Sequence, residues 1–176
     1  MSIAYLLLGS NLGNRREYLC NATEAIKKAA GDILQISKIY ESPAWGFDHP
    51  SAFLNQALKL GTSLEASSLL KAILGIEGDL GRQRSGNNYE ARSIDIDILF
   101  YDDIIMNKPE LIVPHPRLQL RRFALKPLSA IAGDYMHPSL KKTVNELLHD
   151  CPDDSVVRLY NEQDLCAQME GSGNAL

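Results

Sequence analysis

The stretch RSIDIDILFY, residues 92–101, places two charged side chains inside a buried β-strand pattern. Isoleucines alternate with Asp95 and Asp97, and alternate residues of a strand point to the same face of a sheet. The two aspartates therefore share one face, with their Cα atoms about 6.5–7 Å apart. The opposite face is expected to be the helix-covered core and to receive Ile94, Ile96, Ile98 and Phe100.

The segments before this strand alternate between the periodicities of strands and helices. They predict strands at residues 2–8, 33–42 and 53–62 and helices at residues 15–30 and 64–80. With the strand at 94–101, this is the element order of an α+β, ferredoxin-like (βαββαβ) fold. Such a fold has an antiparallel sheet with both helices packed on one face. It leaves the other face free to carry a functional site.

The segments after this strand predict C-terminal helical and short-strand additions. Three prolines make residues 108–123 irregular, and a helix over 121–131 is expected to be interrupted near Pro127. Thr143, with Glu146 three residues later, has the pattern of a capping box at the start of another helix.

The composition is that of an ordinary soluble globular protein. The chain has 176 residues, 45% of them hydrophobic, and a formal net charge of −4. We predict a monomer with one domain over residues 1–160 and a frayed tail over 161–176. The acidic net charge argues against a nucleic-acid or membrane-surface partner. Three cysteines without a Cys-x-x-Cys pair argue against a zinc site and favour reduced thiols in the cytoplasm.

The aspartate pair is the first candidate for chemistry. Two carboxylates so close together repel each other, and burial increases that cost. Mg²⁺ removes the cost, because it binds through one or two carboxylates together with substrate phosphates. Two Mg²⁺ ions at Asp95 and Asp97 would therefore suit phosphoryl transfer. For a lone Asp-x-Asp, a simple solvated position on the sheet face is the commoner explanation.

Arginines flank the aspartate strand on both sides. They comprise Arg82, Arg84, Arg92, Arg117, Arg121 and Arg122. Such clusters in an acidic chain favour a bound polyphosphate, although surface salt bridges could account for two or three of them. Glu77 lies on the apolar stripe of the second predicted helix. It needs a partner there, such as a ligand hydroxyl or a loop arginine, unless it reaches water at the helix end.

Aromatic residues near the predicted site suggest a planar, nitrogen-rich substrate. Phe53 and Asn55 share a strand face, where a ring can stack and an amide can both donate and accept. Trp45 lies in the loop before them, and Phe123 follows the second arginine cluster. Core packing is the alternative for each aromatic. His115, between two prolines, could bind phosphate, donate a proton or be merely structural.

The chain resembles the 6-hydroxymethyl-7,8-dihydropterin pyrophosphokinases, a family of folate-biosynthesis enzymes. The resemblance covers about residues 3–160. It rests on LGSNLG (8–13), SPAWG (42–46), FLN (53–55), GRQR (81–84), RSIDIDILFY (92–101), VPHPRL (113–118) and RRFAL (121–125). The arginine followed by the double-aspartate strand is a specific signature, and the other motifs follow the family's order.

The resemblance implies transfer of the pyrophosphoryl group of ATP, as a unit, to the hydroxymethyl group of the pterin, with release of AMP. It implies that Asp95 and Asp97 hold two Mg²⁺ ions. Catalytic stabilisation of the phosphates would come from Arg82 and Arg92. ATP would be bound by Glu77, Arg84, Tyr89, Arg92, Ile98, His115 and Arg121. The pterin would be bound by Ser42, Pro43, Ala44, Trp45, Phe53, Asn55, Asp95 and Phe123.

Two other functions are compatible with the predicted fold. A nucleotidyl cyclase or polymerase would use the aspartates, but it would not use the aromatic pocket and would release pyrophosphate. An RNA-binding module would expose aromatic residues on the central strands of a basic surface. The acidic composition and the aspartates on the open face oppose that module. Within the resemblance itself, residues 89–91, Tyr-Glu-Ala, depart from the family's usual aromatic, glycine, then proline or alanine.

Overall fold

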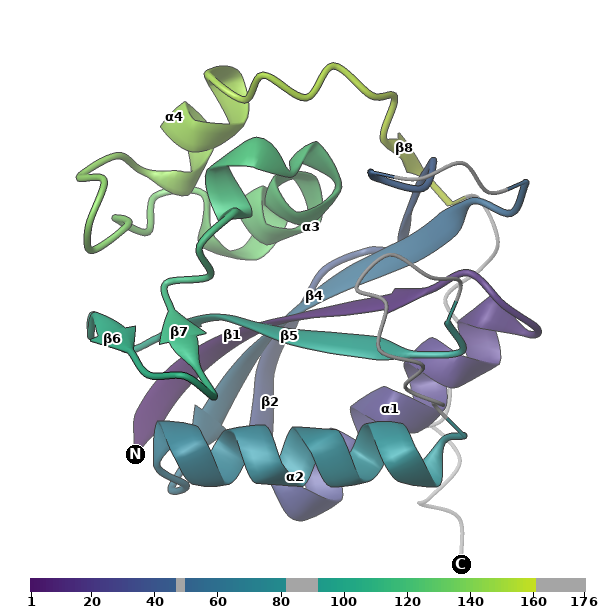
Figure 1. Ribbon diagram of the computed structural model, residues 1–176, viewed down its shortest axis with the longest axis vertical. Coiled ribbons are helices and arrows are strands. Elements are labelled where there is room, and N and C mark those ends of the chain that lie inside the picture. Colours follow the sequence, from purple (N-terminus) through teal and green to yellow (C-terminus); the bar gives the residue numbers. More distant parts are fainter. Residues whose placement is uncertain (47–49, 82–91, 161–176) are drawn as a thin grey trace, which may run out of the picture.

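The computed structural model of this protein describes residues 1–46, 50–81 and 92–160 (Figure 1). The elements in chain order are β1 (Ser2–Ser10), α1 (Arg15–Ala29), β2 (Asp32–Ile36), β3 (Tyr40–Ser42), β4 (Phe53–Thr62), α2 (Ala66–Asp79), β5 (Asp95–Tyr101), β6 (Met106–Asn107), β7 (Ile112–Val113), a 3₁₀ turn (Leu118–Leu120), α3 (Arg122–Ala132), α4 (Val144–His149) and β8 (Arg158–Leu159). The predicted order of strands and helices up to residue 101 is confirmed, except that one predicted strand is divided into β2 and β3.

The main sheet is built around β1, which pairs antiparallel with β5 on one side and with β4 on the other. Among the described residues the strand order is β5–β1–β4–β3–β8, and β2 also pairs with β4. This arrangement confirms the ferredoxin-like α+β fold. The helices α3 and α4 and the short strand β8 are the predicted C-terminal additions.

The strand predicted over residues 33–42 is in fact two strands, β2 and β3, separated by Ser37 to Ile39. Ser37 forms two hydrogen bonds with Ala57 of β4, and one of them uses its side chain. Its N–H donates to the Ala57 carbonyl and its hydroxyl accepts the Ala57 N–H, each at 2.9 Å. The side chain thus replaces a backbone acceptor in the ladder. A single regular strand is interrupted at this point.

One face of the main sheet packs against α1 and α2, below the sheet in Figure 1. The stripes of these helices bury apolar side chains such as Leu19, Ile26, Leu69 and Ile73. They meet the isoleucines of β5 and the leucines of β1. Because burial of apolar area is the main stabilising term in folding, this cluster holds the sheet to both helices.

The other face was expected to be free, but α3 and α4 cover part of it (Figure 1). A second apolar cluster fills the space between the sheet and these helices. It contains Tyr5, Leu7, Ala57, Leu99, Phe100, Leu118, Leu125, Leu128 and Leu147. The packing of α1 and α2 on one face is as expected, but the expectation that the other face is free is wrong where α3 and α4 cover it.

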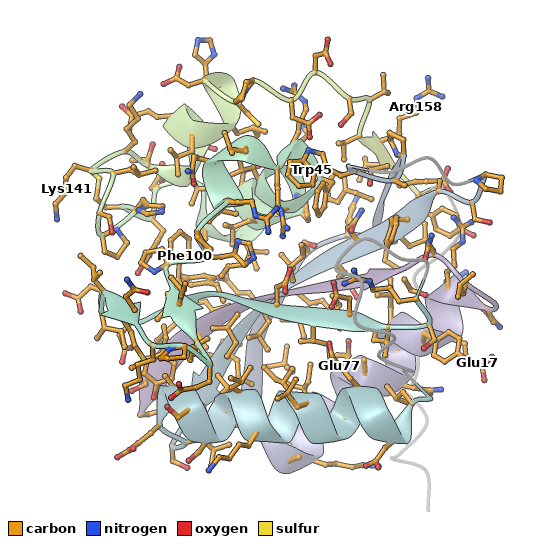
Figure 2. All side chains as sticks on the ribbon, in the orientation of Figure 1. Glu17, Trp45, Glu77, Phe100, Lys141 and Arg158 are labelled. Atoms are coloured by element: carbon orange, nitrogen blue, oxygen red, sulfur yellow. The ribbon has the colours of Figure 1, made fainter. Side chains whose placement is uncertain are left out.

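Phe100 is the one residue of the aspartate strand whose predicted side is wrong. Tyr5 lies opposite Phe100 and Leu6 opposite Ile98, so β5 holds one extra residue, Leu99, at this point. The extra residue inverts the alternation that follows it. Leu99 and Phe100 consequently both join the α3 side, where Figure 2 shows Phe100.

The expected interruption of the helix near Pro127 is also wrong, since α3 runs from Arg122 to Ala132 with Pro127 inside it. Pro127 is buried, and in an α-helix its missing N–H deprives only the Phe123 carbonyl of a partner. The capping box at Thr143 and Glu146 is confirmed, and it opens α4.

In the part of the chain that the structure describes, no helix combines the length and the apolar character needed to cross a membrane. Cys151 carries a free thiol.

Candidate active site

The two aspartates of β5 lie on the face of the sheet opposite α1 and α2, as predicted. Their side chains are partly exposed, at 23% for Asp95 and 31% for Asp97. Each carboxylate contacts a guanidinium group. Arg92 Nη1 lies 2.6 Å from Asp95 Oδ2, and Arg121 Nη1 lies 3.4 Å from Asp97 Oδ2. The strand therefore presents two carboxylates and two arginines at one place.

The surroundings of Asp97 disfavour its charged form next to the Asp95 carboxylate. Burial, followed by the charge of Asp95, raises the pKa of Asp97 to about 7, although Arg121 and Arg92 oppose the change. A carboxylate held in this way gains from a nearby cation. Within the described ranges, no three histidine, cysteine or acidic side chains gather as a metal cluster. Two carboxylates on one strand face suit Mg²⁺, which binds through one or two carboxylates and leaves its other positions to phosphate and water.

His115 lies beside the same aspartate. Its Nε2 is 3.3 Å from Arg121 Nη1 and 3.9 Å from Asp97 Oδ2. Burial, then the charges of Arg121 and Arg117, lower the pKa of His115 to about 4. The ring is therefore neutral at physiological pH. It can bind a phosphate or a ribose through a hydrogen bond, but it contributes no positive charge.

Arg121 joins the charged part of the site to an aromatic part. Its guanidinium carbon lies 5.1 Å from the centroid of the Trp45 ring and 5.7 Å from that of Phe123. The two rings are 6.2 Å apart and tilted by 53°. Figure 2 shows Trp45 on the α3 side of the sheet. Arg121 therefore contacts two of the aromatic residues that the sequence singled out, Trp45 and Phe123.

Asn55 of β4 lies on the same side of the sheet and is 1% exposed. Its Nδ2 donates to the Ser42 hydroxyl at 2.9 Å, which orients the amide. Across β1, Gly9 pairs with Asn55 on one side and with Asp95 on the other. A Cβ on Gly9 would lie 3.4 Å from Asn55 Oδ1 and 3.8 Å from Phe53 Cδ1. Because glycine has no Cβ, the row from the Asn55 amide to the Asp95 carboxylate carries no side chain at its middle position.

Glu77 lies on α2, on the opposite side of β5, and is only 2% exposed (Figure 2). Its Oε1 accepts the N–H of Ile96 at 2.8 Å. The alternative that Glu77 reaches water at the helix end is therefore wrong. Its carboxylate instead holds the backbone of the residue between the two aspartates. A direct contact between Glu77 and ATP stays a prediction.

The remaining predicted residues fall into three groups. Pro43 and Ala44 belong to the segment that follows β3. The side chain of Ile98 is 5% exposed in the α1–α2 core, so a ligand could reach only its backbone. The residues that lie outside the described ranges are Arg82, Arg84 and Tyr89, together with the unusual segment 89–91.

Asn11 is a residue of this site to which the sequence alone assigned no role. It is 1% exposed and bonded to the backbone of Arg92. The signal in the sequence was an asparagine three residues after the first predicted strand and four residues before the first predicted helix. Nothing in that pattern indicates which distant residue it contacts.

Comparisons with known proteins agree with this geometry. Residues 5–133 match the family model described as 7,8-dihydro-6-hydroxymethylpterin-pyrophosphokinase (HPPK). The chain is 41% identical, over 146 residues, to the 2-amino-4-hydroxy-6-hydroxymethyldihydropteridine pyrophosphokinase of Aquifex aeolicus, with 83% of this chain and 90% of that protein covered. It is 38% identical, over 151 residues, to the folic acid synthesis protein FOL1 of Dictyostelium discoideum, with 86% of this chain and 23% of that protein covered.

Solved structures show the same fold. The crystal structure of Plasmodium falciparum HPPK-DHPS wild type aligns with a TM-score of 0.68 at 19% sequence identity. The alignment covers 84% of this chain and 44% of that one. This chain therefore spans less than half the length of that protein, and the likeness is one of fold.

Proposed function

Since this chain belongs to the 7,8-dihydro-6-hydroxymethylpterin-pyrophosphokinase family, we propose that it transfers the pyrophosphoryl group of ATP to the hydroxymethyl group of 6-hydroxymethyl-7,8-dihydropterin. The hydroxyl oxygen would bond to the β-phosphorus, and the bond from that phosphorus to the α-phosphate oxygen would break. AMP leaves with that oxygen, and the hydroxyl proton is released. The product would be the pterin diphosphate, an intermediate of folate biosynthesis.

One observation carries this proposal more than any other. The row Asp95, Gly9 and Asn55 runs across three neighbouring strands on one face of the sheet. Neighbouring strands are about 4.8 Å apart, so the carboxylate and the amide are about 10 Å apart at their Cα atoms. A substrate of about that length can contact both the Asp95 carboxylate and the Asn55 amide. Arg121, which contacts the rings of Trp45 and Phe123, also contacts Asp97, two residues along β5 from Asp95.

The residues of β5 are suited to a metal–phosphate group. Two Mg²⁺ ions at Asp95 and Asp97 would supply positive charge to the phosphates of ATP. Their fit rests on the shared face of the two carboxylates and on the raised pKa of Asp97, which is caused by burial and by the neighbouring Asp95 charge and would be lowered by a bound cation. The aspartates themselves, held on a strand in the core, keep their separation without reorganisation.

Arginines would stabilise the phosphates directly. Arg92 and Arg121 lie 2.6 and 3.4 Å from the aspartates, so a phosphate held by that pair would meet both guanidinium groups. Arg82 is expected to join Arg92 in stabilising the charge that develops on the transferred group. The further ATP contacts are expected from Glu77, Arg84, Tyr89, Ile98 and His115.

The pterin would occupy the aromatic part of the site. We expect its ring to stack between Phe53 and Phe123, with Trp45 beside it. Asn55, oriented by Ser42, can donate to and accept from the edge of the heterocycle. The backbone of Pro43 and Ala44 would bind the remaining edge. Asp95 would contact the hydroxymethyl group that reacts.

The products of the reaction test this function. With ATP and Mg²⁺, AMP should form only when the hydroxymethyl-dihydropterin is present, in equal amount to the pterin diphosphate. ADP as the nucleotide product would indicate an ordinary kinase. Pyrophosphate would indicate a nucleotidyl transferase, and either result would refute the proposal. As a control, Asp97→Asn should remain folded and lose AMP formation by about 100-fold or more.

We also propose that the protein is a cytoplasmic monomer with small-molecule substrates. The acidic net charge of −4 supports the absence of a nucleic-acid partner. Size-exclusion chromatography with light scattering tests the monomer, because a dimer would double the molar mass from 19.5 kDa.

A further inference from the structure

We propose that Asn11 is a positioning residue for Arg92, and that turnover depends on it through the Arg92 side chain. The inference rests on the proposed function, in which Arg92 stabilises the transferred phosphates. Asn11 itself is not expected to touch ATP or the pterin. It would act by fixing the main chain from which the Arg92 guanidinium extends.

Two hydrogen bonds join Asn11 to the backbone of Arg92. The Asn11 N–H donates to the Arg92 carbonyl at 3.1 Å, and Asn11 Oδ1 accepts the Arg92 N–H at 2.7 Å. Both backbone groups of one arginine are thus held by one asparagine. Because Asn11 is 1% exposed, water cannot readily replace these bonds.

The Asn11–Arg92 pair fixes the backbone that leads into β5. Gly9 of β1 and Asp95 of β5 are the last regular pair of the two strands. The Asn11–Arg92 pair lies beyond it, so the intervening Ser93 and Ile94 are held at both ends. From that backbone the Arg92 side chain returns to Asp95, with Nη1 2.6 Å from Oδ2. The guanidinium can keep this place only if its main chain is held.

The chemistry of the residue fits this task. An amide oxygen accepts the Arg92 N–H without adding a negative charge. A carboxylate of the same shape would add a further negative charge at the backbone of Arg92, near the Arg92–Asp95 pair. A serine is too short to bring its oxygen to the position of Oδ1. Asparagine therefore combines the required reach with neutrality.

A double-mutant cycle tests the inference. The cycle compares kcat for AMP formation in wild type, Asn11→Ala, Arg92→Ala and the double variant. We expect Asn11→Ala to lower kcat about 10- to 100-fold when Arg92 is present. With Arg92→Ala as the background, the same substitution should change kcat less than about twofold. The melting temperature should fall equally in both backgrounds, because Arg92→Ala keeps the backbone groups that Asn11 holds.

Asn14→Ala is the matched control in the same loop. Asn14 is exposed, and its side chain caps α1 by accepting the Glu17 N–H at 3.3 Å. Its loss should lower the melting temperature through the helix while kcat stays unchanged. If Asn11→Ala does not fold, Asn11→Ser replaces it in the cycle, because serine also lacks the reach to Arg92 but keeps a polar group there.

Three results would overturn the inference. Equal losses of kcat in both backgrounds would mean that Asn11 acts on something other than the Arg92 side chain. An unchanged kcat in Asn11→Ala would mean that the two bonds do not matter for turnover. An unchanged kcat in Arg92→Ala would remove the role of Arg92 as well. Failure of the proposed function is distinct from all three, because the wild-type protein itself would then form no AMP.

Discussion

Gly9 sets how much room the sheet leaves between Asn55 and Asp95. It is the middle residue of the row that these two side chains flank, and the row carries the proposed contacts to the pterin and its hydroxymethyl group. A methyl group at this position would be in ordinary van der Waals contact with Asn55 Oδ1 and Phe53 Cδ1. The fold can therefore accept alanine, but the substrate would lose the space.

We predict that Gly9→Ala separates binding from stability. The free energy of unfolding should stay constant or rise by about 0.5–1 kcal/mol, since glycine is unfavourable inside a strand. The KM for the pterin should rise about 10-fold, which corresponds to about 1.4 kcal/mol, with little change in the KM for ATP. Steady-state kinetics with each substrate varied in turn, together with urea unfolding, measure both effects.

Gly75→Ala is the control for this prediction. Gly75 lies in α2, and a Cβ there would meet no heavy atom within 4 Å. The variant should gain up to about 1 kcal/mol from helix propensity and keep both KM values. A Gly9→Ala enzyme with an unchanged KM for the pterin would show that the ring does not lie over Gly9.

At the scale of elements, α2 and β5 are joined by a polar contact in an apolar interface. Glu77 reaches from α2 to the N–H of Ile96, and both residues are buried. This N–H lies between the two aspartates, so the bond fixes the backbone that sets the positions of Asp95 and Asp97. A buried N–H without an acceptor costs about 1–3 kcal/mol.

We predict that Glu77→Leu lowers the free energy of unfolding by about 1–3 kcal/mol, because leucine fills the space but accepts no hydrogen bond. Glu77→Gln keeps an acceptor oxygen and should lose less than about 1 kcal/mol. Urea unfolding of both variants makes the comparison. If Glu77→Leu were as stable as Glu77→Gln, the bond to Ile96 would not hold the strand.

The bounds of a strand or helix could be predicted where the local pattern of apolar residues determines them. The strand predicted over residues 53–62 has the observed bounds of β4, because its residues are buried almost throughout. The split at Ser37 could not be predicted, since it depends on a bond from the Ser37 hydroxyl to a strand twenty residues later. The side of Phe100 depends on a register shift opposite Tyr5 and Leu6, which no local pattern contains.

The candidate site also combines features that the sequence predicts with features that only tertiary packing produces. Asp95 and Asp97 could be placed from strand alternation alone, and their shared face is confirmed. The contact of Arg121 with Asp97 and with two aromatic rings arises only from the packing of α3 against the sheet. The contact of Asn11 with Arg92 joins positions 81 residues apart, so the type of residue alone could not reveal it.

On the scale of the whole molecule, the sheet lies between two helical layers (Figure 1). The layer of α1 and α2 holds the aspartate strand from behind. The layer of α3 and α4 brings Arg121 and Phe123 over the other face. The integrity of the second layer should therefore affect the site, even through residues far from the aspartates.

His137 is such a residue, in the segment between α3 and α4. It is 4% exposed, and its ring meets Phe100 edge to face with centroids 5.4 Å apart. Nδ1 accepts the N–H groups of Ser139 and Leu140, each at 3.2 Å. Burial lowers the pKa of His137, so the folded protein favours the neutral ring. A proton on Nδ1 would remove both bonds and leave a charge beside the second apolar cluster.

The direction of the pH dependence follows from this lowered pKa. Above the unfolded-state pKa of about 6.5, histidine is neutral in both states and the folded protein keeps its full stability. Below it, the unfolded chain binds a proton that the folded protein resists, so stability falls. We predict that wild type loses more stability from pH 7.5 to pH 5 than His137→Asn, which cannot titrate there. Urea unfolding at several pH values measures the two slopes.

His149→Asn is the control, because it removes an exposed histidine at the end of α4. At pH 7.5 wild type should be more stable than His137→Asn by about 1–3 kcal/mol, since the variant lacks the buried ring with its packing and hydrogen bonds. That gap should narrow toward pH 5 in wild type and equally in His149→Asn. A constant gap across the range would mean that the α3–α4 layer tolerates a protonated His137, and that its stability does not depend on the neutral ring.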